Sequence, residues 1–413
     1  MCSSLSMLDP IGWLFPNLQE LYINFSEMAI LQPHYLAPLL APSLRSLTLY
    51  TSSNSIDEEA ACDILRRLRS RKAKIREISY IGYSSSLIVE AIMSFSSLRA
   101  LSIPCCAFSK EGECRTITTS FLTRNLTNLD INVDHFPENV LQQLRKGLES
   151  LVSLTSLSLR GSLDTIHKFI RDLKPVASIS SFGLYRHSLS SSSKDRIAAL
   201  IPSLATIFPH LHTLHLENMN RNILMVTLND LMSLQEKPMQ TLILINCLKS
   251  TDPTNDIREI LKVWPKLHHL WFDGDDVFAE EILPLISGSA PFLRDLTLPL
   301  RFNDEWNGPI VTQVVCPLQY LRIPPSYELF PKVFGHARIL LELFPELKTI
   351  SERTGSIGRY ATVDLDAHDL SIDNTNSTIS EKRKEKRRKL NVPIRSMGRE
   401  CNGTRVAQAL GLM

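Results

Sequence analysis

The 413-residue sequence lacks the short motifs that mark common catalytic and nucleotide-binding sites. It contains no G-x-S-x-G, no phosphate-binding loop, no H-E-x-x-H, no dinucleotide fingerprint and no phosphatase-like loop of cysteine and arginine. Its eight cysteines form no C-x-x-C pair and have no partner histidines at zinc spacing. These absences argue against an enzyme, and they predict that the chain uses no cofactor and no metal.

Long apolar runs and a secretory leader are missing as well. Nowhere do 18 apolar residues follow one another to span a bilayer, and the first ten residues lack a basic segment followed by an apolar stretch. The cysteines show no disulfide framework. We therefore expect a reduced protein of the cytoplasm, the nucleus or both, without membrane contact.

Strong net charge is missing from most of the chain. The formal net charge is +2, but residues 381–389 carry seven positive and two negative charges, net +5, which leaves −3 for the rest. A body with that balance is no general polyanion binder, so we expect nucleic acid to be contacted only through this run. Such runs are commonly just solvated, but this one is also a nuclear-import candidate, formed by Lys382, Arg383, Lys384, Lys386, Arg387, Arg388 and Lys389.

What the sequence does contain is one apolar pattern that recurs thirteen times. Residues 211–218 read L-x-x-L-x-L-x-N, and residues 239–247 read M-x-x-L-x-L-x-N-C. The mean spacing is about 27 residues, within the range of leucine-rich repeats. The first positions are Leu18, Leu44, Ile75, Leu98, Leu126, Leu154, Ile179, Leu211, Met239, Leu267, Leu293, Leu318 and Leu347.

Segments between these triplets have helical spacing. Ser55-Ile56-Asp57-Glu58 reads as a capping box, and Pro137 and Pro253 stand where helices should start. Further helices are expected over 164–173, 194–207, 223–234, 277–287 and 332–344. A unit of strand, turn and helix cannot bury its own apolar face, so such units must stack. The sequence predicts an α/β leucine-rich repeat solenoid, a horseshoe with parallel strands on the concave face and helices on the convex face. It would span residues 1–351 in about 13 units, followed by a mainly disordered basic tail over 352–413.

The solvent-facing strand positions are the candidate binding surface. Side chains alternate along a strand, so the third, fifth and seventh residues of each triplet should face solvent. The central repeats offer small polar residues there, whereas the run from His215 to Arg322 adds aromatic, apolar and charged ones. Aromatic and arginine anchors are the usual hot spots of protein interfaces. The predicted protein-binding residues are Ile243, Ile245, His269, Trp271, Asp273, Tyr320 and Arg322.

Two other interpretations apply to the same positions. Trp271 and Ile243 would also be explained by lateral packing on neighbouring strands. His215, His269 and Asp273 could meet on the concave face in a way that suits a metal, but polar residues are expected at exposed strand positions in any case. No metal site is therefore predicted.

The residues Leu211-His212-Thr213-Leu214-His215-Leu216-Glu217-Asn218 and Leu242-Ile243-Leu244-Ile245-Asn246-Cys247 also carry a family likeness. Phe-Pro or Trp-Pro precedes strands at residues 15–16, 208–209, 264–265 and 344–345. Over residues 11–351 the chain resembles the cysteine-containing leucine-rich repeats of F-box proteins, in particular the divergent arrays of fungal F-box-like proteins. Only Asn218 and Asn246 clearly hold the family's asparagine position, and the F-box itself is not found, since 17 residues precede Leu18.

The resemblance implies a non-catalytic scaffold that recognises a protein substrate for a ubiquitin ligase. A cullin-ligase adaptor would be a second partner if an F-box lies upstream of Met1. The alternative is a leucine-rich repeat regulator outside ubiquitin ligation, similar to the activating proteins of the nuclear-transport GTPase or to a nuclear adaptor. Those activating proteins carry acidic tails, whereas the tail here is basic.

Overall fold

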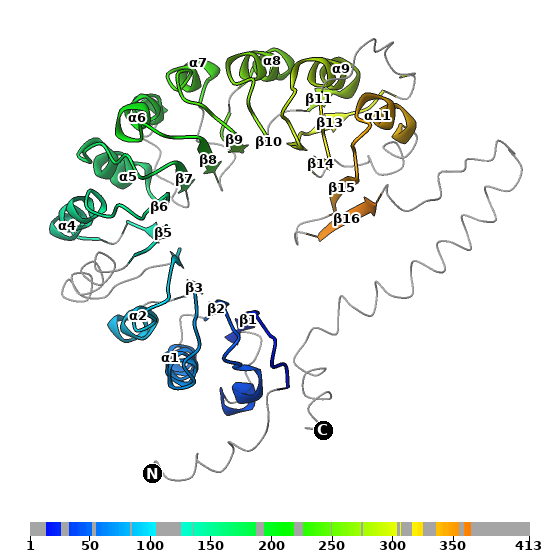
Figure 1. Cartoon of the computed structure of the whole chain (residues 1–413). Coiled ribbons are helices and arrows are strands. Elements are labelled where there is room, and N and C mark those ends of the chain that lie inside the picture. Colours follow the sequence, from blue (N-terminus) through cyan, green and yellow to red (C-terminus); the bar gives the residue numbers. More distant parts are fainter. Residues whose placement is uncertain are drawn as a thin grey trace, which may run out of the picture.

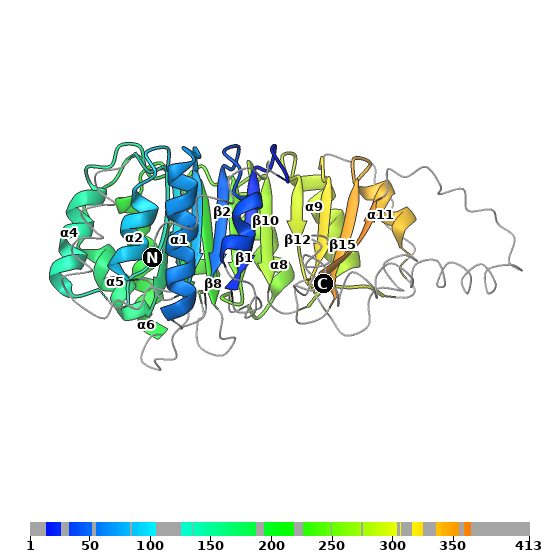
Figure 2. The ribbon, with the colours of Figure 1, turned by 90° about the horizontal axis from the view of Figure 1, so that it is seen from below.

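The chain forms one curved solenoid (Figure 1). The computed structural model describes residues 14–25, 33–51, 55–82, 85–104, 125–134, 136–186, 194–218, 226–248, 250–273, 276–303, 306, 316–324, 336–354 and 359–364. Strands line the inner side of the arc and helices its outer side (Figure 1). Seen from below, the strands lie side by side along the length of the molecule, and each strand runs across that length (Figure 2).

Thirteen parallel strands make the concave sheet. Each begins two residues after a predicted first position, so the repeat register and the predicted leucine-rich repeat solenoid are confirmed. The strands are β1 (Glu20–Asn24), β2 (Ser46–Tyr50), β3 (Glu77–Ile81), β4 (Ala100–Ile103), β5 (Asn128–Asn132), β6 (Ser156–Gly161), β7 (Ser181–Arg186), β8 (Thr213–Asn218), β9 (Thr241–Ile245), β10 (His269–Asp273), β12 (Asp295–Thr297), β14 (Tyr320–Ile323) and β15 (Thr349–Thr354).

The sheet continues past residue 351. β15 extends to Thr354, and β16 (Arg359–Asp364) pairs with it in antiparallel fashion as a fourteenth strand. The basic run 381–389 lies outside the described residues. A separate two-stranded sheet forms where β11 (Val277–Phe278) pairs with β13 (Leu300–Arg301).

Helices follow most strands. They are α1 (Ser55–Ser70), α2 (Ser86–Met93), α4 (Glu138–Leu148), α5 (Leu163–Arg171), α6 (Lys194–Ile207), α7 (Leu228–Met232), α8 (Pro253–Val263), α9 (Ala279–Ser289) and α11 (Ala337–Leu343), with a 3₁₀ helix, η3, at Pro33–Leu39. As predicted, Pro137 is the N-cap of α4 and Pro253 is the first residue of α8. Among the described residues, no helix is long and apolar enough to cross a bilayer.

Contacts between neighbouring repeats shape two of the predicted helix starts. The side chain of Ser55 lies outside the described residues, so its capping box stays a prediction, whereas Glu58 accepts a hydrogen bond of 3.0 Å from the backbone N–H of Ser85 in the next repeat. The helix predicted over 223–234 is shorter in the described residues, since Val226 forms a bridge with Leu248 and α7 covers only Leu228–Met232. Thr227 and Asp230 form the capping box of α7.

The repeats share one continuous apolar core between sheet and helices. Alternate strand residues point into it, so Leu214 and Leu242 are fully buried and stand in register on β8 and β9. The asparagine and the cysteine of the repeat pattern both form hydrogen bonds between the repeats of β8 and β9. Buried Asn218 donates to the carbonyl of Asn246 at 3.3 Å, and the buried Cys247 thiol donates to the carbonyl of Leu216 at 3.5 Å. Asn246 takes a left-handed φ of 52° there, a conformation that asparagine tolerates.

Candidate functional site

The concave face is built from solvent-facing side chains in rows that cross the strands. Parallel pairing keeps the same repeat position opposite itself from strand to strand, so Thr48, Ser79 and Ser102 are direct neighbours. At about 4.8 Å per strand and 3.3 Å per residue, thirteen strands of five residues present roughly 1,000 Å². That area matches the roughly 800 Å² that each partner contributes to a standard protein interface.

All seven predicted binding residues lie on this face, on β9, β10 and β14. Ile243, Trp271 and Arg322 fall in one row, His269 and Tyr320 in the adjacent row, and Ile245 and Asp273 in a third. Tyr320 is 38% exposed, whereas the other six are partly buried. β12 separates β10 from β14, and its Thr297 stands between Trp271 and Arg322. The prediction that Thr297 faces solvent is wrong, because this side chain is only 3% exposed between its larger neighbours.

Some polar atoms at this end of the face are buried without a hydrogen-bond partner in the described part of the chain. They are Nε2 of His269, Nε1 of Trp271 and Oγ1 of Thr297. Burial lowers the pKa of His269, and the positive charge of Arg322 adds to the effect, against the opposing charge of Asp295. Arg322 and Asp295 form an ion pair of 3.4 Å. A buried unsatisfied donor costs about 1 to 3 kcal/mol, so a ligand that accepts from Trp271 would recover that energy.

A chain of polar contacts crosses the middle of the face from β4 to β8. Ser102 donates to Asp130 Oδ2 at 2.7 Å, and Arg160 holds both carboxylate oxygens of Asp130 at 2.8 and 2.9 Å. The Arg160 guanidinium lies 4.1 Å from the ring centre of Tyr185. The Tyr185 hydroxyl is 2.8 Å from Nδ1 of His215, whose Nε2 lies 3.3 Å from Glu217. Each of these side chains except Glu217, which His215 contacts within β8, is therefore held in place by a residue from a neighbouring repeat.

Gly183 makes room for this arrangement on β7. A Cβ atom there would lie 2.7 Å from Oγ of Ser158 and 2.9 Å from the ring of Tyr185. Burial raises the pKa of Tyr185 to about 12, with the charge of Asp130 adding to the effect, so its hydroxyl keeps its proton at neutral pH. Tyr185 can therefore act as a donor toward His215.

We expect Asp130→Ala to lower the free energy of unfolding by about 1 to 3 kcal/mol, because the Arg160 guanidinium would stay partly buried without its carboxylate. Both side chains are about one-fifth exposed, which limits screening by water. Urea titration followed by circular dichroism measures the change, with Ser156→Ala on β6 as the control. A loss no larger than that of the control would show that the polar chain contributes nothing to stability.

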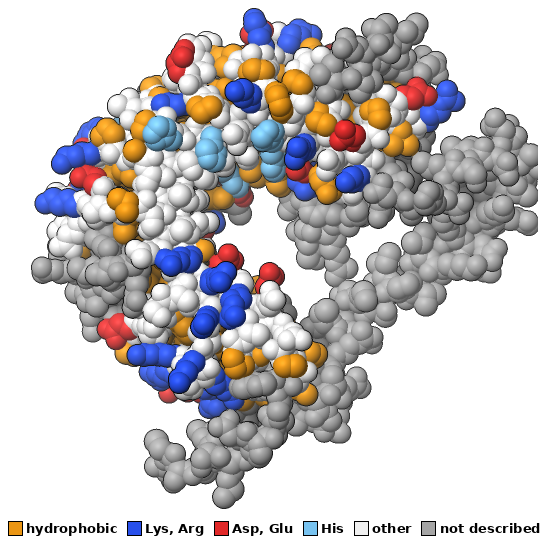
Figure 3. Space-filling view, in the orientation of Figure 1, with side chains coloured by type: hydrophobic (Ala, Val, Ile, Leu, Met, Phe, Trp, Pro, Cys, Tyr) orange, Lys and Arg blue, Asp and Glu red, His pale blue; other side chains and the backbone are white. Residues whose placement is uncertain are grey.

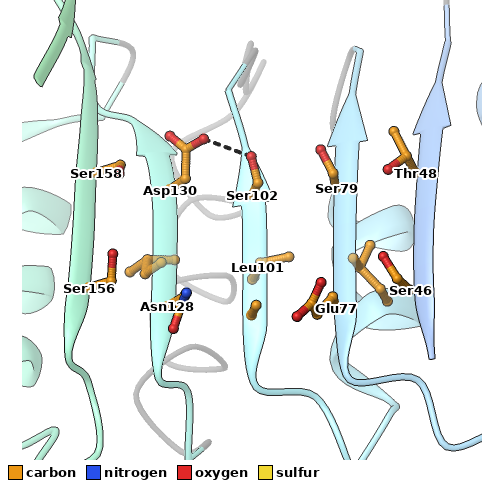
Figure 4. A pocket seen from close by; sticks show the side chains of 13 residues that line it. Ser46, Thr48, Glu77, Ser79, Leu101, Ser102, Asn128, Asp130, Ser156 and Ser158 are labelled. Atoms are coloured by element: carbon orange, nitrogen blue, oxygen red, sulfur yellow. Dashed lines mark hydrogen bonds between the residues drawn. The ribbon is translucent and has the colours of Figure 1, made fainter. Parts of the chain in front are cut away.

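A hollow of about 310 Å³ adjoins this polar chain on the concave face. Figure 4 shows two rows of short side chains around it, on β2 to β6. Leu101 and its neighbours Ile78 and Leu129 also line it, and Ala100 contributes only a methyl group. Its polar lining is Ser46, Thr48, Glu77, Ser79, Ser102, Asn128, Asp130, Ser156 and Ser158.

Sequence reasoning missed this hollow, because it gave little weight to the small polar residues of the central repeats. The available signal was that short side chains recur at equivalent positions in four of five successive units: Thr48, Ser79, Ser102 and Ser158. Sequence reasoning also gave no weight to Tyr22 of β1. This residue is 63% exposed in the same row as Thr48.

The residues weighed as metal ligands are not brought together. His215 and His269 stand on β8 and β10 in different rows, with β9 between them. No group of three or more His, Cys, Asp or Glu that could hold a metal occurs in the described part of the chain. The thiols of Cys62, Cys247 and Cys316 are free and buried, and burial raises the pKa of Cys62 to about 11 and that of Cys316 to about 12. The nuclear-import candidates Lys382 to Lys389 lie outside the described residues.

No family model and no curated protein matches the chain. Among solved structures, it is similar to a yeast protein in the crystal structure of the Rad7 and Elc1 complex, with 14% identity and a TM-score of 0.44 over 79% of this chain and 82% of that one. It is also similar to a chain in the crystal structure of the TLR13–ssRNA13 complex, with 17% identity and a TM-score of 0.34. That match covers 76% of this chain but only 44% of the other. Neither likeness says what this chain binds.

Proposed function

We propose that this chain is a non-catalytic scaffold whose concave face binds a protein partner. The observation that carries the proposal is the hollow on β2 to β6, set in a continuous face of thirteen in-register strands. Short side chains let a partner approach the sheet closely there, and their hydroxyl and amide groups offer hydrogen bonds. A small-molecule site is usually enclosed, whereas this hollow is open to solvent on the concave face.

The partner extends toward the aromatic end of the face. From β4 to β10 the pairing order runs through six strand spacings, roughly 29 Å, which an extended segment of about nine residues covers. A partner of that length contacts the hollow, the polar chain around Arg160 and the row that holds Trp271. The partner therefore has an extended or elongated contact segment.

The finer role we propose is substrate recognition in an F-box-like ubiquitin ligase receptor. Its support is the resemblance carried by residues 211–218 and 242–247 to the repeats of F-box proteins. Affinity purification of the chain from its own cells, with the genomic sequence upstream of Met1 included, tests this role. Recovery of a cullin-ligase adaptor is expected. A partner recovered repeatedly without any adaptor would place the chain among repeat regulators that act outside ubiquitin ligation.

Filling the hollow is expected to block partner binding. Ser79→Trp places an indole among Thr48, Ser102 and Glu77, and we expect affinity for the captured partner to fall at least about tenfold, the loss of 1.4 kcal/mol. Thr349→Trp on β15 is the matched control, since it introduces the same indole on the concave face outside β2 to β10. Binding is measured by biolayer interferometry, and circular dichroism checks the fold. Equal affinities for the two variants would contradict the proposed site.

A further inference from the structure

Seven basic residues and no acidic ones lie between positions 66 and 76. Sequence reasoning considered only the run at 381–389 and passed over this segment, which covers the end of α1 and the turn into β3. The residues are Arg66, Arg67, Arg69, Arg71, Lys72, Lys74 and Arg76. Of these, Lys74 and Arg76 stand in the turn that leads into the concave sheet.

The fold adds two arginines from neighbouring repeats. The carbonyl of Arg45 accepts from the backbone N–H of Arg76 at 2.7 Å, and the carbonyl of Arg76 accepts from that of Arg99 at 2.7 Å. Arg45, Arg76 and Arg99 thus form a row where β2, β3 and β4 begin. Lys and Arg side chains gather there on the inner rim of the arc (Figure 3). We name Arg45, Lys74, Arg76 and Arg99 the basic rim.

The basic rim has no carboxylate partner within ion-pair distance among the described residues, whereas Arg145, Arg160 and Arg322 each have one. Arg45 donates to the backbone carbonyls of Pro42 and Leu44, and Arg99 donates to that of Asn125. Lys74, Arg76 and Arg99 are exposed. The rim therefore presents positive charge toward solvent.

The basic rim borders the hollow. Arg45, Arg76 and Arg99 each immediately precede a residue that lines it, namely Ser46, Glu77 and Ala100. We propose that the basic rim binds an acidic segment of the same protein partner that occupies the hollow. This inference rests on the proposed function for the identity of the partner, and it adds the chemistry that the partner must carry.

Spacing and charge favour an acidic polypeptide over a nucleic acid. Neighbouring strands are about 4.8 Å apart, so Arg45 and Arg99 stand roughly 10 Å apart, the length of three extended residues. Two or three carboxylates in a short peptide satisfy that row. A longer polyphosphate would run past the rim to the exposed Glu20 on β1 and along a body whose net charge outside residues 381–389 is −3.

A photoreactive decaglutamate peptide tests the rim on the full chain. Crosslinks mapped by mass spectrometry are expected on residues near Lys74, Arg76 and Arg99, and also on the basic run 381–389, which serves as an internal reference. In the variant Lys74→Glu/Arg76→Glu/Arg99→Glu, rim crosslinks should fall at least about tenfold relative to that reference, since each lost ion pair and new repulsion weakens binding several-fold. Lys146→Glu/Arg258→Glu/Lys262→Glu makes the same charge change on exposed positions of α4 and α8 and should have no effect.

Three results would overturn the inference: rim crosslinks no higher than with decaglutamine, equal rim crosslinks in both triple variants, or complete displacement by a 20-nucleotide oligothymidylate at lower concentration than by free decaglutamate. If the triple variant does not fold, the double variant Lys74→Glu/Arg76→Glu repeats the test, because neither side chain has a hydrogen bond or ion pair in the described residues. If decaglutamate labels the rim but Ser79→Trp leaves partner binding unchanged, the proposed function is contradicted and the acidic ligand of the rim is not. If Ser79→Trp abolishes partner binding but the rim is not labelled, only the proposal of an acidic segment is contradicted.

Discussion

Leu214→Asp is expected to abolish cooperative folding of the solenoid. Leu214 is fully buried on β8 and stands in register between Phe182 and Leu242, both also fully buried. Leu→Ala at such a site typically costs about 2 to 5 kcal/mol. A carboxylate costs more, because it loses its hydration and finds no cation among these side chains. Whole domains are stable by only about 5 to 15 kcal/mol, so the array should not survive the change intact.

Thermal and urea unfolding followed by circular dichroism measure this effect. Thr213→Asp is the matched control, because Thr213 precedes Leu214 on the same strand but is partly exposed on the concave face. We expect the control to change the free energy of unfolding by less than about 1 kcal/mol. Equal stability of the two variants would show that the alternation of core and surface residues on β8 is wrong.

Trp271→Ala is expected to weaken partner binding about 30-fold, the loss of roughly 2 kcal/mol that marks a hot spot. Trp271 stands between Ile243 and Thr297 in one row of the concave face. Its Nε1 is a buried donor that has no hydrogen-bond partner among the described residues. A partner that covers the ring and accepts from Nε1 gains both apolar contact and a hydrogen bond, and alanine removes both.

The competing interpretation is lateral packing, and stability separates the two. If Trp271 only fills space between its neighbouring strands, alanine should lower the free energy of unfolding by about 3 kcal/mol or more and leave affinity at the wild-type value. Thr241→Ala on β9 is the control, because it trims a neighbouring concave position to the same methyl group. Affinity is compared by biolayer interferometry and stability by urea titration. Unchanged binding in Trp271→Ala would show that the interface does not include the part of the concave face around Trp271.

The amino-acid sequence alone determined the architecture. The apolar triplet repeats about every 27 residues, and the apolar residues of each unit can be buried only when strand and helix units stack. Each of the thirteen strands starts two residues after a predicted first position. Helix starts at Pro137 and Pro253 also followed from the sequence, since proline tolerates the first turn of a helix. The seven predicted binding residues lie on the concave face for the same reason, although their role in binding stays a prediction.

Only the tertiary structure decided what side chains from different repeats do to one another. Ser102 and Glu217 are ends of one polar chain, and Thr297 is buried between Trp271 and Arg322. Glu58 accepts a hydrogen bond from a backbone N–H of the next unit. The hollow depends on short side chains that are adjacent across strands, and the basic rim on arginines more than 20 residues apart in the chain. Periodicity is a local property that states which side of a strand a residue faces. Contacts across strands depend instead on the size and charge of the residues one repeat away, which become neighbours only when the sheet has formed.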